Sequence, residues 1–357
     1  MKIAVRVDAS DQIGTGHFMR CLTLANTLKQ RGAQIRFICR YLPEHLRSML
    51  AAKGHQLVLF ENAQSEQALD ELAHARWLGV SQAQDAADSI QALSDETWDW
   101  VIVDHYALDH RWESLLRQIA RKILVIDDIA DRQHDCDILL DQNLYADMQN
   151  RYSGKVPLHC QLLLGPRYAV LRDEFRLLHE QIKFRSGVVK RVLIFFGGVD
   201  ADNYTGRAVG ALSEIDIPDL YVDVVIGAQH PCREQIEAAC AQHGFICHVQ
   251  TDRMAELMAS ADLAIGAGGS ASWERCCLGL PALLVALADN QINIAKALDS
   301  IGACVYIGTI ETASTPIIRG AIIDLLSAKD RLKILSEKAY SLVDGMGVGR
   351  ICQEMSC

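Results

Sequence analysis

The sequence predicts an α/β protein with two Rossmann-like units, each built around a parallel β-sheet with helices on both faces. Short runs rich in β-branched residues alternate with helical patterns along almost the whole chain, which is typical of this class. A charged stretch that ends near residue 185 interrupts the alternation, which then starts again. With 357 residues, of which 50% are hydrophobic, the chain has enough apolar material for two ordinary cores.

The first unit is expected over residues 1–165, with strands at 2–7, 34–39, 55–60, 100–104, 122–127 and 138–140. The charged helical stretch at 171–184 indicates a linker over 166–189. The second unit is expected over 190–357 and includes a C-terminal helix. Its strands are expected at 191–196, 221–226, 245–249, 263–265 and 282–285. Two such units would leave a cleft that faces the carboxyl ends of both sheets.

A glycine loop and a helix follow the first strand. The loop is Gly14-Thr15-Gly16-His17, and the helix ends at Gly32. Its apolar stripe consists of Phe18, Leu22, Ala25 and Leu28. A dinucleotide site would need a third glycine where Met19 stands, and an acidic residue after the second strand, where the chain has Cys39-Arg40. The sequence therefore argues against a nicotinamide or flavin cofactor.

Gly14, Gly16 and His17 form a candidate site at the start of this helix. The glycines allow a sharp turn and a close approach to a ligand, and the helix N-terminus attracts anions. The same end of the helix disfavours a protonated imidazole, so His17 is expected to be neutral and able to act as a general base. The alternative is a histidine that only caps the helix or packs on the sheet.

Two similar loops are expected in the second unit. One holds Gly197 and Gly198 after the first strand of that unit, and the other holds Gly268, Gly269 and Ser270 after the fourth. The second loop leads into a short helix that ends near Gly279 and Pro281. Backbone amides in such loops favour a diphosphate, so we expect both loops to contact one.

Glu274 lies in the first turn of that short helix, where a carboxylate would repel a phosphate bound at the same end. A ribose would resolve this conflict, because its two hydroxyls can donate to one carboxylate beside the diphosphate. The alternative is a glutamate that only complements the helix dipole. Asn290 and Gln291 open the next helix and could face the sugar diphosphate, or could be ordinary cap amides.

Composition and charge exclude several other classes of protein. The net charge of −10 argues against a nucleic-acid partner, whose phosphates need cations. No apolar run approaches the roughly 20 residues of a membrane span, and the first residues do not resemble a signal peptide, so we expect a cytoplasmic protein without membrane insertion. The 12 cysteines are expected to be reduced core thiols, and the sequence holds no common zinc motif, so no metal is expected.

Several motifs together make the chain resemble the UDP-2,4-diacetamido-2,4,6-trideoxy-β-L-altropyranose hydrolases of pseudaminic acid biosynthesis, which have the GT-B fold of nucleotide-sugar enzymes. The most specific motif is the run from Ile13 to Ala25, which reads G-T-G-H-x-M-R-C-x-T-L-A from Gly14 on. The other matching segments are Arg6 to Ser10, Val103 to Tyr106, Ile126 to Asp128, Leu164 to Arg172, Phe196 to Gly198 and Gly268 to Ser270.

The resemblance implies that His17 is the catalytic base and that Glu274 contacts the nucleotide. It implies a hydrolase that splits the C1–O bond of the UDP-sugar and serves the synthesis of flagellin or surface glycans. We expect inversion at C1, because a water held by His17 would approach from the face opposite the departing UDP. No metal or cofactor is expected, which agrees with the absence of a metal motif. Asp8 and Tyr106 are assigned to the substrate, Arg20 and Arg172 are candidate cations, and no role is assigned to Asp104, Asp127 and Asp128. A GT-B glycosyltransferase with a UDP-N-acetyl sugar donor and a non-catalytic binder stay open, as does the oligomeric state.

Overall fold

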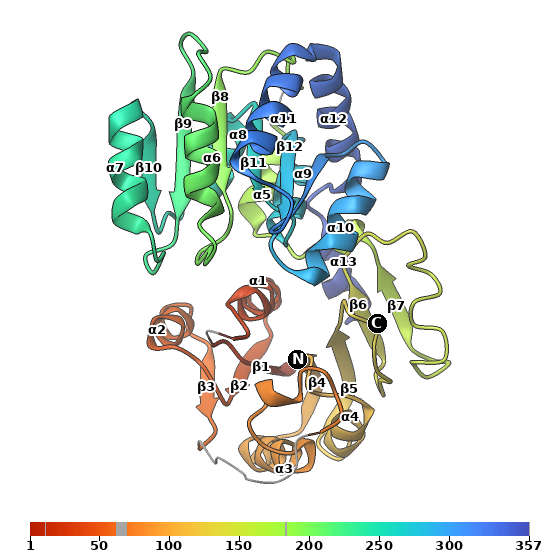
Figure 1. Cartoon of the computed structure of the whole chain (residues 1–357). Helices are drawn as coiled ribbons and strands as arrows, with labels where there is room; N and C mark the ends of the chain where they lie inside the picture. Colours follow the sequence, from red (N-terminus) through yellow and green to blue (C-terminus); the bar gives the residue numbers. More distant parts are fainter. Residues whose placement is uncertain (11, 62–69, 183, 357) are drawn as a thin grey trace. The chain divides into compact units, whose positions relative to one another are not determined.

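The structure is a computed structural model that describes residues 1–10, 12–61, 70–182 and 184–356. The chain divides into two compact units (Figure 1). Unit 1 comprises Met1–Asn143, Asp147–Val170 and Gly347–Cys357, and unit 2 comprises Leu144–Ala146 and Leu171–Met346. Each unit is an α/β domain with one parallel sheet, as the sequence predicts.

The sheet of unit 1 has seven strands in the order β3-β2-β1-β4-β5-β6-β7, and all of its pairs are parallel. The strands are β1 (Lys2–Val7), β2 (Gln34–Cys39), β3 (Gln56–Leu59), β4 (Trp98–Asp104), β5 (Ala120–Ile126), β6 (Ile138–Asp141) and β7 (Gln161–Leu164). Its helices are α1 (Gly16–Gln30), α2 (Glu44–Ala52), α3 (Gln82–Leu93), α4 (His110–Leu116) and α13 (Gly347–Glu354), with 3₁₀ turns η1 (Ala75–Trp77) and η2 (Pro166–Tyr168).

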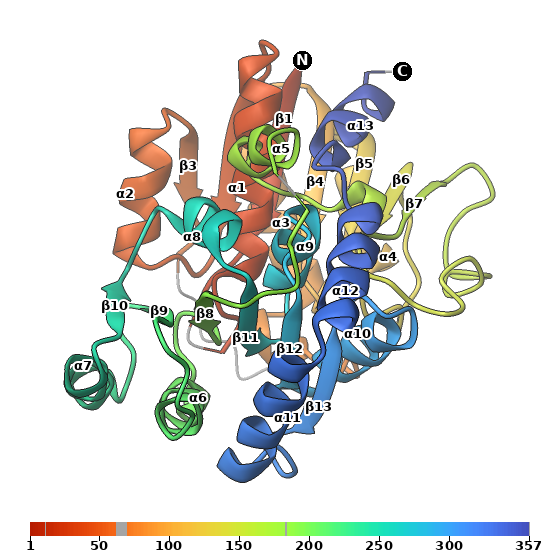
Figure 2. The same ribbon diagram turned by 90° about the horizontal axis from the view of Figure 1, so that it is seen from above.

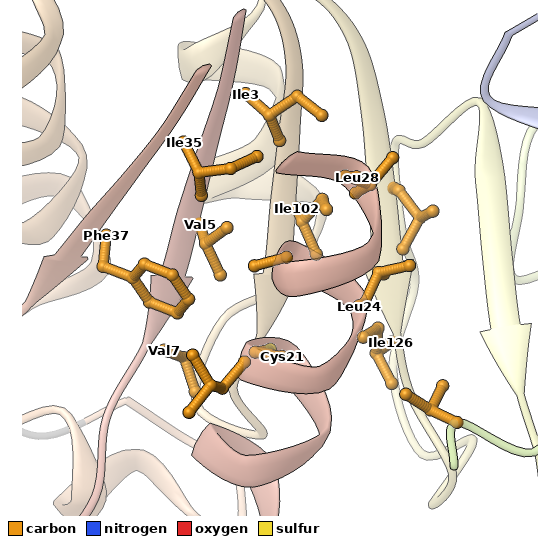
Figure 3. Packing of buried hydrophobic residues seen from close by; sticks show 14 of the residues in the cluster. Ile3, Val5, Val7, Cys21, Leu24, Leu28, Ile35, Phe37, Ile102 and Ile126 are labelled. Carbon is orange, nitrogen blue, oxygen red and sulfur yellow. The ribbon is translucent and has the colours of Figure 1, made fainter. Parts of the chain in front are cut away.

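The core of unit 1 forms on both faces of this sheet, because successive side chains of a strand point to opposite faces. Ile3, Val5 and Val7 of β1 belong to one buried cluster, whereas Ala4 belongs to the cluster on the other face. Figure 3 shows α1 packed over the first face, with its apolar side chains directed at those of β1. The predicted stripe of α1 is therefore confirmed, and Gly32, with φ +90°, turns the chain into β2.

Unit 2 contains a six-stranded parallel sheet in the order β10-β9-β8-β11-β12-β13. Its strands are β8 (Arg191–Phe195), β9 (Tyr221–Ile226), β10 (Ile246–Val249), β11 (Leu263–Ala267), β12 (Ala282–Ala286) and β13 (Val305–Thr309). Its helices are α5 (Asp173–His179), α6 (Tyr204–Ser213), α7 (Arg233–His243), α8 (Met254–Ser260), α9 (Ala271–Cys277), α10 (Asp289–Ser300), α11 (Thr315–Ser327) and α12 (Lys329–Leu342). Helix α12 packs against α9 (Figure 2).

The C-terminal helix is grouped differently from the expected division, which placed the whole of 190–357 in the second unit. Helix α13 packs on α1 and η2, and the indole of Trp100 donates a hydrogen bond of 3.1 Å to the Met355 carbonyl. A β-carbon at Gly347 would lie 2.3 Å from the Ala169 carbonyl oxygen, so the helix begins in close contact with unit 1. The expected boundary does not reveal this return of the chain, because it follows the order of the elements along the sequence.

Other expectations also differ in detail, and several strand ends lie one or two residues from the expected ones. Within residues 171–182 and 184, the described part of the helical stretch expected at 171–184, the structure has the seven-residue helix α5. Strands β7 and β13 are not among the expected strands: each lies at the edge of its sheet and pairs with one neighbour. Strands β4 and β5 each begin two residues earlier than expected, because Trp98 and Ala120 already pair with each other.

Each sheet has a switch point, where the chain leaves neighbouring strands in opposite directions and ligands of open α/β sheets commonly bind. In unit 1 it lies between β1 and β4, and in unit 2 between β8 and β11. The predicted glycine loops follow three of these four strands, and Asp104 ends the fourth. Both switch points therefore carry residues singled out from the sequence.

Within the described residues, no helix is long and apolar enough to cross a membrane. The described cysteines form no disulfide, and most of them are buried.

Candidate active site

The first glycine loop positions His17 at the switch point of unit 1. Gly14 has φ +74°, a conformation that favours glycine, and its amide donates to the Ser10 carbonyl at 2.7 Å. Apart from its chain neighbours, no atom of the described residues would lie within 4 Å of a β-carbon at Gly14 or Gly16. Helix α1 begins at Gly16, which makes His17 its second residue, as the sequence predicts.

A carboxylate holds the ring of His17. Its Nδ1 atom lies 2.6 Å from Oδ1 of Asp104, the last residue of β4. An ionised carboxylate has no proton to donate, so Nδ1 is the hydrogen-bond donor and Oδ1 of Asp104 is the acceptor. In a neutral imidazole with the proton on Nδ1, the other ring nitrogen, Nε2, can accept a proton. This arrangement orients a histidine and prepares it to act as a general base.

Arg20 completes the charge balance around this pair. It donates to both oxygens of Asp104, at 2.5 Å from Nε and 2.7 Å from Nη2, and its Nη1 atom donates to Asp128 at 2.9 Å. Burial alone would raise the pKa of Asp104, but Arg20 and His17 hold that pKa well below its ordinary value. Asp104 therefore stays ionised and can stabilise the positive charge that a base acquires on His17.

Aromatic side chains form a wall beside His17. Tyr106 lies edge-on to the His17 ring, with centroids 4.6 Å apart, and its hydroxyl donates to Asp128. Trp77 from η1 stacks on Tyr106 at 5.5 Å, and His74 packs edge-on against Trp77 at 4.5 Å. We call His74, Trp77 and Tyr106 the aromatic wall. Trp77 and His74 are only partly buried, so the wall could contact a ligand beside His17.

Asp8 lies near this site but inside the protein. Its side chain has no exposed surface, and its Oδ1 atom accepts from the backbone amides of Arg40 and Tyr41 at 2.7 and 3.1 Å. Arg6 forms an ion pair with Asp8 at 2.7 Å, and His105 lies 3.3 Å from it. Through these partners Asp8 ties β1 to the start of the loop after β2, and its assignment to the substrate stays a prediction.

The other aspartates named from the sequence split between the site and its support. Asp128 belongs to the site through Arg20 and Tyr106. Asp127 is fully buried and pairs with Arg132 at 2.9 Å, which stabilises the loop after β5. Among the described residues, no group of three or more His, Cys, Asp or Glu side chains could hold a metal ion.

In unit 2, the glycine loops approach neighbouring backbone closely. Gly197 has φ +106°, and a β-carbon at Gly227 would lie 2.1 Å from the Gly198 carbonyl oxygen. A β-carbon at Gly268 would lie 3.3 Å from Cβ of Ala295, and the Gly268 amide donates to the Val285 carbonyl at 3.0 Å. The loops thus run over the carboxyl ends of β8 and β11.

Glu274 occupies the first turn of α9, as the sequence predicts. Burial raises the pKa of its carboxyl above the ordinary value, although the charge of Arg172 opposes the rise. No hydrogen bond or ion pair within the described part of the chain satisfies this carboxylate. Arg172 itself pairs with Glu174 at 2.9 Å. The structure therefore presents Glu274 as a partly buried acceptor that has hydrogen-bonding capacity for a ligand.

The two amides at the start of α10 differ from each other. Gln291 accepts from the Leu287 amide at 3.0 Å, and its side-chain nitrogen would lie 3.5 Å from a β-carbon at Gly269. Gln291 thus braces the loop that holds Gly268, Gly269 and Ser270. Asn290 is exposed and extends from the same turn.

The overall architecture matches known structures along nearly the full chain. MurG of Acinetobacter baumannii matches with a TM-score of 0.67 at 16% identity, over 100% of this chain and 99% of its own. A protein described as a putative UDP-N-acetylglucosamine 2-epimerase of Listeria monocytogenes matches with a TM-score of 0.58 at 13% identity, over 99% of this chain and 95% of its own. The chain has the GT-B fold. Fold alone does not fix the reaction, since CalG4, described as the calicheamicin glycosyltransferase, matches with a TM-score of 0.63 and shares the fold with the protein described as an epimerase.

Part of this GT-B chain also matches a family model. Residues 192–343 match the C-terminal domain of glycosyltransferase family 28. The match lies within unit 2 and includes both of its glycine loops and Glu274.

Curated relatives of the GT-B chain confirm the resemblance expected from its motifs. The UDP-2,4-diacetamido-2,4,6-trideoxy-β-L-altropyranose hydrolase of Campylobacter jejuni is 26% identical over 85% of this chain and 97% of its own. The spore coat polysaccharide biosynthesis protein SpsG of Bacillus subtilis is 23% identical over 98% of this chain and 96% of its own. An uncharacterized protein of Methanocaldococcus jannaschii, MJ1062, is 24% identical over 82% of this chain, which spans 57% of that relative.

The structure also brings in residues that sequence reasoning did not select. Trp77 and His74 stand far from any glycine loop in the sequence, and only the fold places them beside His17. Arg275 follows Glu274 directly, but a single arginine in a short helix carries no pattern that marks it as buried. A mixed polar and aromatic run such as His74-Ala75-Arg76-Trp77 between predicted elements is the one signal that could have pointed to the wall.

Proposed function

We propose that this chain is a hydrolase that splits UDP-2,4-diacetamido-2,4,6-trideoxy-β-L-altropyranose into UDP and the free sugar, a step of pseudaminic acid biosynthesis. The proposal combines the GT-B fold with a relative of that name and with the pairing of His17 and Asp104. The observation that carries it is this pairing, because attack of water on C1 requires a base that removes its proton. An acceptor hydroxyl would need the same base, so the name of the relative supports water rather than an acceptor.

In the proposed reaction, water is deprotonated by Nε2 of His17 as its oxygen attacks C1 of the sugar. The proton passes to the imidazole, whose positive charge is stabilised by Asp104 through Nδ1. The C1–O bond breaks, and its electron pair leaves on the β-phosphate of UDP. A direct displacement of this kind inverts the configuration at C1.

The leaving group needs charge neutralisation more than protonation, because a diphosphate is already stable as an anion. In the proposal, the backbone of the loops with Gly197, Gly198, Gly268, Gly269 and Ser270 holds the diphosphate. The carboxylate of Glu274 accepts from the ribose hydroxyls, which satisfies an oxygen pair that the described residues leave unpaired. Gln291 and Asn290 lie in the first turn of α10 and are assigned to the sugar diphosphate.

The partial match to a glycosyltransferase model favours one alternative, a transferase that moves the sugar from UDP to an acceptor. An assay without an acceptor distinguishes the two functions, because only a hydrolase would then consume the UDP-sugar. A hydrolase releases UDP at the same rate in buffer alone, and a transferase needs an added hydroxyl compound.

The deciding experiment determines which product receives the oxygen atom of water. The purified protein is incubated with the UDP-sugar in water enriched in ¹⁸O, and the masses of the products are measured by mass spectrometry. We expect the label on the free sugar and none on UDP. Label on the β-phosphate would mean attack at phosphorus and would end the assignment of His17. Consumption only after an acceptor is added would support the transferase.

A further inference from the structure

A buried arginine at the switch point of unit 2 stands without a carboxylate partner. Arg275 is 2% exposed, and no ion pair joins it to an acidic group among the described residues. Its Nε atom is buried and has no hydrogen-bond partner in that part of the chain. The neighbouring Glu274 attracts it only at longer range. Because a buried charge costs several kcal/mol unless it is paired, an arginine in this state requires an explanation.

The position of Arg275 relates it to both glycine loops. Its Nη2 atom donates to the Ala267 carbonyl, the last of β11, at 2.5 Å and to the hydroxyl of Ser272 at 3.0 Å. A β-carbon at Gly266 would lie 3.1 Å from Nη1 of Arg275 and 2.2 Å from the Phe195 carbonyl, the last of β8. The guanidinium therefore lies where β8 and β11 end, directly beneath the two loops. The missing side chain at Gly266 is what leaves room for it.

We propose that Arg275 is the charge-compensating residue of the nucleotide site: it waits unpaired beneath the loops and is neutralised by the diphosphate of the bound nucleotide. Anions bind at such a switch point through backbone amides, and a cation in a low-dielectric environment adds an attraction that water does not screen. The inference rests on the proposed function for the identity of the ligand, a nucleoside diphosphate. It goes further in assigning its charge recognition to a residue that never reaches the surface.

A purely structural role is the competing explanation. In that case Arg275 only ties the end of β11 to α9 through Ala267 and Ser272. Removing it would then loosen the whole site, and any ligand of the site would bind more weakly. A compensating charge predicts something narrower, namely loss of the phosphate contribution while the nucleoside contribution persists.

The test compares UDP with uridine on the full chain by isothermal titration calorimetry. For Arg275→Met, we expect UDP affinity to fall about 10- to 100-fold, the range for a hydrogen bond or contact to a charged group, and uridine affinity to change less than about threefold. Arg275→Lys, which keeps the charge, is expected to recover most of the UDP affinity. If Arg275→Met does not fold, Arg275→Gln takes its place in the same comparison.

Arg185 offers a matched control in the same unit. Arg185 is partly buried, and like Arg275 it has no carboxylate ion pair among the described residues. Burial lowers its pKa to about 10. It donates instead to carbonyls that include those of Ala261 and Gly279, away from the carboxyl ends of the strands. We expect Arg185→Met to leave the ratio of UDP to uridine affinity unchanged.

The possible results distinguish the charge-compensating role of Arg275 from a structural one, and the inference from the proposed function. Equal losses for UDP and uridine in Arg275→Met would establish the structural role and overturn the inference, as would an unchanged UDP affinity or a wild-type protein that binds no UDP. A wild-type protein that binds UDP through Arg275 but hydrolyses no UDP-sugar would overturn the proposed function and leave the inference standing.

Discussion

The two switch points treat buried charge in opposite ways. In unit 1, Arg20 shares Asp104 and Asp128, and although burial alone would lower the pKa of Arg20, these carboxylates raise it well above the ordinary value. In unit 2, burial lowers the pKa of Arg275 and raises that of Glu274, because neither group has a hydrogen-bonded partner of opposite charge among the described residues.

The charged side chains of one site are paired within the protein, whereas those of the other site lack a partner of opposite charge among the described residues. The switch point of unit 1 pairs Arg20 with two carboxylates, and one of them, Asp104, holds the ring of His17 in place, which is what a base requires. Unit 2 keeps a cation and a carboxylate unsatisfied, which lowers the stability of the free protein and increases what a charged, hydroxylated ligand can recover on binding.

Substitutions of one carboxylate in each unit give the largest contrast. Asp104→Asn is expected to cost about 3 kcal/mol of the free energy of unfolding, the lower end for breaking a buried ion pair, because Arg20 keeps Asp128. Glu274→Gln is expected to cost no stability, since it removes an unsatisfied charge, but to weaken UDP binding by ~1–3 kcal/mol. Urea unfolding and calorimetry measure both. A destabilised Glu274→Gln protein with unchanged UDP affinity would reverse the comparison.

Replacing the proposed base tests the chemical half of the comparison. His17→Asn is expected to lower kcat by ~10² or more, because the water loses its proton acceptor, and to leave UDP affinity unchanged. The residual UDP binding serves as the control for folding. Turnover near that of the wild-type protein would remove His17 from the mechanism, whatever the fate of the sites in unit 2.

Much of this contrast could be predicted from local sequence, and part of it could not. The glycine loops, the first turn of α1 and the place of Glu274 follow from short motifs next to strands, so sequence reasoning found them. The pairing of His17 with Asp104 joins residues 87 positions apart, and the burial of Arg275 depends on an absent side chain at Gly266. Helix α13 returns to unit 1 from the far end of the chain. Long-range packing decides these features, and no local pattern encodes it.

Acid is expected to act on unit 1 first. Four of its buried aspartates, Asp8, Asp85, Asp104 and Asp127, have pKa values below the ordinary range, because arginine partners outweigh the effect of burial. Such groups stabilise the folded state above the unfolded pKa of about 4 and lose that contribution as the pH falls further. In unit 2, Asp223 shares this behaviour. Protonation instead stabilises the fold at Glu274 of unit 2 and at Asp141 of unit 1, because burial raises the pKa of both carboxyls, that of Asp141 to about 7.

Pulse-labelling hydrogen exchange between pH 5 and pH 2.5 measures this difference segment by segment. We expect peptides from β1 and β4 to lose protection at a higher pH than peptides from β8 and β11. Earlier loss in unit 2 would show that its uncompensated charges, rather than the ion pairs of unit 1, limit acid stability.

The smallest expected effect concerns the aromatic wall, which belongs to the site of unit 1 but has exposed surface. Trp77 stacks on Tyr106 at 5.5 Å, lies 6.1 Å from the His17 ring and is partly exposed, so its exposed part is suited to the apolar edge of a deoxy sugar or an acetamido methyl group. Trp77→Ala is expected to raise KM by an amount equivalent to ~0.5–1.5 kcal/mol, the usual contribution of an aromatic contact, and Trp77→Phe by less. Because the wall lies in unit 1 and the nucleotide is assigned to unit 2, UDP affinity measured by calorimetry should not change in either variant. A parallel loss of UDP affinity would mean that the wall binds the base of the nucleotide instead of the sugar, and the division of labour between the two switch points would have to be redrawn.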